Sequence, residues 1–158
     1  MSWESTGSLG PVSQVHVRLE DLTRGLRFRA ETTKGFSIDF DSGKGAVHAD
    51  PVQTLLSALG ACHAMDVISI LRKKRLDVTG YEIFLTGQRR FEHPRFFTAI
   101  ETVHRVRGRG VPMEAVEEAV RLSEEKYCTV HHCLRPDIAY TTRIEIVEES
   151  EASAASTG

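Results

Sequence analysis

The chain has 158 residues, 41% of them of hydrophobic types, which is enough for one domain with a continuous core. Its 20 basic and 22 acidic residues nearly cancel, so no strong electrostatic field attracts polyanions. No apolar run approaches the roughly 20 residues that span a membrane. These features argue against nucleic-acid and membrane partners.

The N-terminal sequence lacks the basic segment, apolar run and cleavage site of a secretory signal, so we expect a cytoplasmic protein. Three cysteines in a reducing cytosol do not indicate a disulfide framework, and an odd number cannot pair completely within one chain. The composition of residues 1–12 and 149–158 predicts flexible tails. A single folded domain is therefore expected over residues 13–148.

Three short segments with apolar residues at alternate positions open this domain. Each predicts an antiparallel strand, with Gly25 and Gly35 at the tight connections because glycine reaches positive φ without a Cβ clash. The alternating residues are Val15, Val17 and Leu19, then Leu26, Phe28 and Ala30, then Phe36, Ile38 and Phe40.

The strongest helix prediction begins at Asp50, a capping residue, and Pro51, which suits the first helical position. Between Asp50 and Asp66 there is no charged residue, and apolar or small residues occur on every face. This pattern predicts a central helix that is surrounded by protein.

The rest of the domain predicts a long hairpin, a second helix and a last strand. The hairpin strands are expected around residues 78–88 and 95–107, the helix from Pro112, and the last strand over residues 138–146. Because strands occur in runs instead of alternating with helices, the fold class is α+β and not a doubly wound parallel sheet.

Cys62 and Cys128 are the candidate functional residues. Cys62 lies about three turns into the first helix beside Gly60 and Ala61, whose small size leaves room for a partner group or a substrate. A buried cysteine is nevertheless often only a small hydrophobic residue. Cys128 ends the second helix, at a turn where a thiol can be accessible. Position alone leaves their roles open.

Histidines offer a second hypothesis. His131 and His132 follow Cys128 closely enough to act as a base or, with Cys133, to share a metal ion. A partly exposed turn is the favoured interpretation of this segment. His63 is a poor base for the thiol that precedes it, because neighbours on a helix point about 100° apart. No metal and no cofactor are expected.

Several motifs occur here in one order: a Pro-led helix with LLSALGAC, a hairpin with RRFEHPRFFTAI, and a helix ending LSEEKYC. Together they resemble the OsmC/Ohr family of thiol-dependent hydroperoxide reductases. The branch that this chain resembles most is the YhfA-like OsmC branch, through ALGACHAMDVISIL, RRFEHPRFFTAI and LSEEKYC taken together. The similarity covers nearly the whole folded unit. It implies an OsmC-like fold, with strongly curved antiparallel sheets around central helices, in an intertwined homodimer.

The resemblance also implies a mechanism. The cysteine that matches Cys62 attacks a small organic hydroperoxide and becomes a sulfenic acid. The cysteine that matches Cys128 resolves it as a disulfide, which a dithiol reductant reduces. Family members lower the pKa of the attacking thiol with an arginine, for which Arg24 is the best match. Arg27 and Arg29 are interpreted as cross-strand partners of carboxylates such as Asp39.

One position departs from the family pattern. A glutamate usually follows the helix-starting proline, whereas Val52 and Gln53 follow Pro51 in this chain. Neither side chain carries a negative charge, although Gln53 can supply a hydrogen bond. The alternative function is therefore a catalytically weak or inactive OsmC-like protein that binds a small apolar or thiol-reactive ligand.

Overall fold

The structure is a computed structural model that describes residues 13–21, 23 and 26–150. The chain divides into two compact units, with the boundary between Thr54 and Leu55. Residues 1–12 and 151–158 of the predicted tails lie outside the described residues. Glu149, in the predicted C-terminal tail, donates its backbone N–H to the carbonyl of Gly108 at 2.8 Å. The single domain over residues 13–148 stays a prediction.

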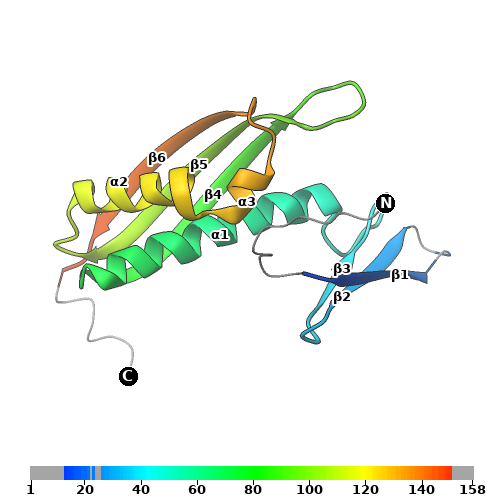
Figure 1. The fold of residues 1–158 in the computed structure, drawn as a ribbon, viewed down its shortest axis with the longest axis horizontal. Coiled ribbons are helices and arrows are strands. Elements are labelled where there is room, and N and C mark those ends of the chain that lie inside the picture. The colour runs from blue at the N-terminus through cyan, green and yellow to red at the C-terminus, as the bar shows by residue number, and fades with distance from the viewer. Residues whose placement is uncertain (1–12, 22, 24–25, 151–158) are drawn as a thin grey trace, which may run out of the picture. The chain divides into compact units, whose positions relative to one another are not determined.

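The first unit contains a three-stranded antiparallel sheet in the order β1-β2-β3, which confirms the three predicted strands (Figure 1). Gly35 has a φ of 82° in the turn between β2 and β3, as its position predicted. Among the described residues of this unit, only Ala30 and Asp41 are buried. The strands are β1 (Val15–Asp21), β2 (Arg27–Thr32) and β3 (Ser37–Phe40).

Helix α1 (Pro51–Lys73) begins where the sequence predicted. Asp50 Oδ1 accepts hydrogen bonds from the backbone N–H groups of Val52 and Gln53, both at 2.8 Å. Gln53 Oε1 accepts the backbone N–H of Asp50 in return, at 3.2 Å. This reciprocal cap fixes the first turn of the helix, and Gln53 contributes a hydrogen bond to it.

The second unit contains the sheet β4-β5-β6, with β4 (Asp77–Arg89), β5 (Phe97–Arg109) and β6 (Ala139–Glu148). Strands β4 and β5 form the predicted antiparallel hairpin. Strand β6 pairs with β5 in parallel, from Ala99 opposite Ala139 to Gly108 opposite Glu148. The expectation of antiparallel sheets therefore fails for this pair, because the intervening helices return the chain to the start of β5.

The connection from β5 to β6 is helical: α2 (Met113–Leu122), a π-helical turn η1 (Ser123–Tyr127) and α3 (Thr129–Cys133). Pro112 caps α2 instead of occupying its first turn. The backbone N–H of Cys128 donates to the carbonyl of Ser123 at 2.8 Å and closes the wide turn. With φ −70° and ψ 96°, Cys128 ends this helical run, as predicted, before α3 begins.

The core of the second unit lies between the sheet and two helices, α2 and the part of α1 from Leu55 onward, which cover the same face of the sheet (Figure 1). Gly60 lets α1 approach β4 closely, since a Cβ added there would lie 2.6 Å from Leu85 Cδ1. The buried core cluster comprises Val67, Leu71, Val106, Val111, Val116, Ala119 and Val120.

Helix α1 is less enclosed than the sequence predicted. Its buried residues, Leu59, Gly60, His63, Val67 and Leu71, follow one stripe along the helix. Elsewhere on the helix Met65 is 73% exposed. Within the second unit, the prediction of a helix surrounded by protein is therefore wrong. Composition predicted an apolar helix, whereas the sheet β4-β5-β6 and α2 bury only one stripe of it in this unit.

Helix α1 also has the length and composition of a membrane span. This finding corrects the expectation that no apolar run of such length exists. A helix that packs inside a protein meets the same criterion, and Val67 and Leu71 of α1 belong to the core cluster. Length and composition therefore do not distinguish a core helix from a membrane helix here.

Candidate functional site

Cys62 and Cys128, the two candidate thiols, come together in the second unit. Their sulfur atoms and a carboxylate oxygen of Asp66 all lie within 4.8 Å of one another. Cys62 and Asp66 stand one turn apart on α1, and Cys128 follows the π-helical turn. Cys62 is half-buried and Cys128 is fully buried. The thiols are therefore close neighbours, and Cys62 is the more accessible one.

Cys128 is held in its protonated form by its surroundings. Burial is the largest cause that raises its pKa, followed by a hydrogen bond with the thiol of Cys62. The backbone N–H of His131 donates to Cys128 Sγ at 3.4 Å and has the opposite, smaller effect. Cys128 is consequently a neutral thiol at neutral pH.

Asp66 is a member of this site that the sequence motifs did not indicate. Its Oδ2 atom accepts a hydrogen bond from Ser123 Oγ at 2.9 Å, and Ser123 is fully buried. The negative charge of Asp66 adds to the upward shift of the Cys128 pKa. A signal was present in the sequence: Asp66 interrupts the uncharged stretch of α1 one helical turn after Cys62.

A cluster of histidines lies on the neighbouring part of the same unit. His63 of α1 and His104 of β5 are 1% and 0% exposed, with ring centroids 6.0 Å apart. His131 of α3 lies 5.6 Å from the ring of His63 and stacks on Tyr140 at 4.4 Å. Burial lowers the pKa of both His63 and His104 to about 4. Both rings are therefore neutral at neutral pH.

This arrangement changes the assignment of the histidines. The hypothesis of a metal site built from Cys128, His131, His132 and Cys133 is not supported, because His132 and Cys133 are exposed and Cys128 is buried beside Cys62. His63, for which the sequence predicted no role, is a neighbour of both His104 and His131. The missed residue, His104, occupies one of the alternating buried positions of β5, where a polar side chain is itself a signal.

The arginines of the first unit have other partners or lie outside the described residues. Arg24, the residue predicted to activate the thiol, is outside them. Arg29 donates to both carboxylate oxygens of Asp39, at 2.6 and 2.9 Å, which confirms the predicted cross-strand pair. Arg27 lies 3.6 Å from the carboxylate of Asp41. Arg27 and Arg29 are thus engaged in ion pairs within the first unit.

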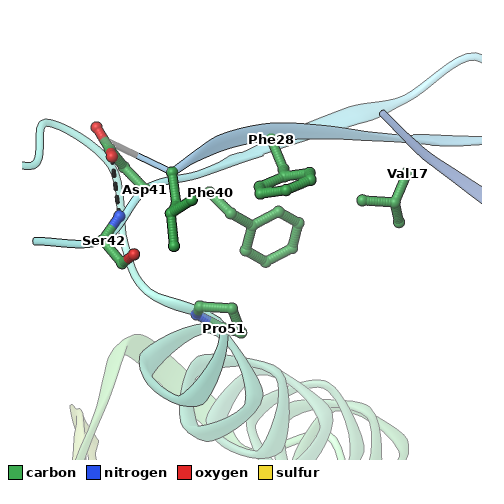
Figure 2. Close-up of a pocket in the computed structure, with 7 residues that line it drawn as sticks. Val17, Phe28, Phe40, Asp41, Ser42 and Pro51 are labelled. Atoms are coloured by element: carbon green, nitrogen blue, oxygen red, sulfur yellow. Dashed lines mark hydrogen bonds between the residues drawn. The ribbon is translucent and has the colours of Figure 1, made fainter. Parts of the chain in front are cut away.

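The first unit also contains a cavity of about 370 Å³. The side chains of Val17, Phe28 and Phe40 project from one face of the sheet toward Pro51 (Figure 2). At one edge, Asp41 accepts the backbone N–H of Ser42 at 2.8 Å. The lining is mostly apolar, so the cavity suits an apolar group. Its lining residues are Val17, Leu26, Phe28, Phe40, Asp41, Ser42 and Pro51.

The fold is that of an α+β protein of the OsmC-like class, with two cysteines close together. The structure superposes on a hypothetical protein from Aquifex aeolicus with a TM-score of 0.79 and 32% identity, over 89% of this chain and 100% of the other. It superposes on the organic hydroperoxide resistance protein OhrB of Bacillus subtilis with a TM-score of 0.55 and 17% identity, over 86% and 98%.

Sequence comparison identifies the family. The family model described as OsmC-like protein matches residues 42–143. The chain is 42% identical to Protein YhfA of Escherichia coli over 123 residues, which is 78% of this chain and 92% of YhfA. The protein belongs to the OsmC family.

Proposed function

We propose that this protein is a thiol-dependent peroxidase that reduces organic hydroperoxides, with Cys62 as the attacking thiol and Cys128 as the resolving thiol. The observation that carries the proposal is the close approach of these two sulfurs. The difference in burial supports the assignment of roles, because a peroxide reaches the half-buried Cys62 more easily than the fully buried Cys128. The hydroperoxide-resistance name of the Bacillus subtilis structure supports the substrate class.

The proposed reaction has two steps on the protein. The Cys62 thiolate attacks the distal oxygen of the hydroperoxide, the O–O bond breaks, and the leaving alkoxide takes a proton to become an alcohol. Cys128 then attacks the sulfur of the Cys62 sulfenic acid, which releases water and leaves a disulfide. A small dithiol returns both cysteines to thiols and is itself oxidised to a disulfide. One hydroperoxide thus consumes one dithiol.

The second step requires Cys128 to lose a proton, although its surroundings favour the neutral thiol. We assign Asp66 the role of proton acceptor, since its carboxylate lies within 4.8 Å of both sulfurs. Ser123 positions that carboxylate through its hydrogen bond. Arg24 is assigned to stabilise the Cys62 thiolate by charge, as the family resemblance implies.

We also propose that the working form is a cytoplasmic homodimer. The supporting observation is the exposed apolar surface of α1, where Met65 is 73% and Leu55 41% exposed. A second copy covering this surface would remove apolar area from water. Light scattering during size exclusion tests this directly: a dimer mass is expected, and Met65→Lys should shift the protein toward monomer.

The function is tested by peroxide consumption with purified protein, cumene hydroperoxide and dithiothreitol. The wild type is expected to turn over and Cys62→Ser to lose turnover, whereas Cys128→Ser treated with the hydroperoxide in the absence of dithiothreitol should stop at a sulfenic acid that dimedone traps. Cys133→Ser is the matched control, because Cys133 is exposed and outside the thiol pair. Undiminished turnover in Cys62→Ser, or none in the wild type, would contradict the proposal.

The apolar cavity of the first unit favours a second candidate function, the binding of a small apolar ligand without turnover. Native mass spectrometry of freshly purified protein would then show a bound small molecule, and Phe28→Ala would lose it. A ligand in the wild type together with no peroxide consumption would favour binding over catalysis.

A further inference from the structure

The histidine cluster contains several buried polar atoms without partners. Among the described residues, neither ring nitrogen of His63 has a hydrogen-bond partner, and the same holds for Nε2 of His104 and Nδ1 of His131. His63 and His104 are almost completely shielded from solvent. A buried polar atom without a partner destabilises the folded state, because it has lost its hydrogen bonds to water. The cluster is therefore expected to hold something that satisfies these nitrogens.

A carboxylate from a third element points to the nature of the occupant. Ligand atoms of His63, His104 and Glu124 all lie within 4.8 Å of one another. These residues come from α1, β5 and the π-helical turn, so the fold itself brings them together. Around a tetrahedral zinc ion with bonds of about 2.0–2.1 Å, ligand atoms stand about 3.4 Å apart. Small side-chain rotations would bring the ligand atoms of His63, His104 and Glu124 to this spacing.

We propose that His63, His104 and Glu124 form a binding site for one divalent transition-metal ion of the zinc class. Two imidazoles and one carboxylate are donors that zinc accepts, whereas magnesium and calcium prefer oxygen ligands alone. The three residues leave a fourth position, which water or the nearby His131 fills. This site is separate from the thiol pair, and it does not depend on the proposed peroxidase activity.

Neighbouring groups orient two of the ligands. Tyr81 Oη lies 2.5 Å from His104 Nδ1, so Nδ1–H donates to Tyr81 in the tautomer that leaves Nε2 free for a metal ion. Thr142 Oγ1 donates to Glu124 Oε1 at 2.5 Å. Such outer partners, which fix the direction of metal ligands, are a regular feature of metal sites.

The local charge also suits a dication. Glu124 supplies one negative charge within the ligand set. Asp66 supplies a second, since its carboxylate acts electrostatically on His63. Two carboxylates balance the charge of one divalent ion, which reduces the cost of burying it.

The rival location is the cluster of Cys62, Asp66 and Cys128, whose atoms satisfy the same distance criterion. Cobalt distinguishes the two, because Co²⁺ bound to thiolate has an intense near-ultraviolet charge-transfer band that Co²⁺ bound to nitrogen and oxygen lacks. We therefore choose Co²⁺ absorption, with Zn²⁺ competition, on reduced full-length protein stripped of metal. The expected result is one ion per chain without the charge-transfer band.

Variants then assign the ligands. His104→Gln and Glu124→Gln should each weaken Zn²⁺ binding by at least about 100-fold, beyond what loss of an outer partner causes. The exposed His132→Gln is the matched control, and the double variant Cys62→Ser with Cys128→Ser should bind Zn²⁺ like the wild type. Circular dichroism checks that each variant is folded, and Glu124→Gln, which is only half-buried, serves if His104→Gln misfolds.

Two results would overturn the proposal. A charge-transfer band that disappears in the cysteine double variant would place the metal at the thiols instead. Absence of Zn²⁺ and Co²⁺ binding in the folded wild type would mean that buried water satisfies the histidines.

Discussion

The two units of this protein are stabilised in different ways. The second unit has a continuous core in which Leu71 and Val106 are completely buried. The sheet of the first unit leaves Val15, Val17 and Ile38 about half exposed. A sheet with so little buried surface gains little from the hydrophobic effect by itself. We conclude that the second unit provides most of the free energy of unfolding of the single chain.

The pKa shifts of titratable side chains also differ between the first unit and the interior of the second. In the first unit, ion pairs hold the pKa of carboxyl groups such as Glu31 and Asp39 below the usual value and so favour their charged forms. In the interior of the second unit, burial favours neutral forms: it raises the pKa of Cys128 and lowers that of His63. The side chains proposed to react or to bind metal are therefore concentrated where water is excluded.

Core truncation should give the largest difference between the units. Leu71→Ala removes a fully buried side chain, so we expect it to lower the free energy of unfolding by about 3 kcal/mol. Ile38→Ala, at a position that is 46% exposed, should cost less than about 1 kcal/mol. Urea unfolding measures both. An equally large loss in Ile38→Ala would show that another surface covers the first sheet.

A methyl group at a close approach should have the next largest effect. In Gly108→Ala the added Cβ would press against the backbone carbonyl oxygen of Asp77, which cannot move aside easily. A cost of about 2 kcal/mol is expected from such overpacking. Gly80→Ala on the same hairpin is the control, because its nearest new contact is Arg107 Cδ at 3.4 Å. Thermal unfolding should separate the two variants, and equal values would contradict this account.

Alkaline pH should lower the stability of the second unit, because the buried Cys128 thiol loses its proton. Its pKa is higher in the folded protein than in the unfolded chain, so the folded state binds the proton more tightly and stability falls as pH rises. Above the ordinary thiol value of about 8.5, this fall is at most about 1.4 kcal/mol per pH unit. Urea unfolding of the reduced protein at increasing pH measures it. Cys128→Ala should show a shallower slope, and an unchanged slope would refute the assignment.

The smallest effect concerns one ion pair of the first unit. Hydrogen bonds from Arg29 are the main cause that lowers the pKa of Asp39. Arg29→Gln should therefore raise that pKa, which carbon-detected NMR titration of the carboxyl group measures. The stabilising effect of the pair exists above the ordinary pKa of Asp39 and is lost as pH falls through its lowered value. Arg18→Gln, which removes the partner of Glu31, should leave Asp39 almost unchanged.

The sequence predicted features that depend on local pattern. Alternation predicted the strands, and Asp50 with Pro51 predicted where α1 begins. The motifs that contain Cys62 and Cys128 predicted the family. Each of these signals lies within a few neighbouring residues, which is why one sequence was enough to find it.

Features that depend on packing were not predictable in this way. Alternating residues in β6 show which side chains share a face, but not whether the strand runs parallel to β5. Likewise, His63, His104 and Glu124 are distant in sequence, and only the packing of α1, β5 and the π-helical turn brings them together. Composition showed that α1 is apolar without showing what covers it.

The number of residues in the π-helical turn, and not only their type, determines how the Cys128 thiol is oriented relative to Cys62. The bond from Cys128 N–H to the Ser123 carbonyl spans one residue more than an α-helical bond does. Every residue added to a helix rotates the next part of the chain by about 100°. Deleting one residue between Ser123 and Cys128 would therefore redirect the Cys128 thiol, whereas conservative substitutions there would not. A relative that lacks one residue in this turn would keep both cysteines but would not place their two thiols side by side.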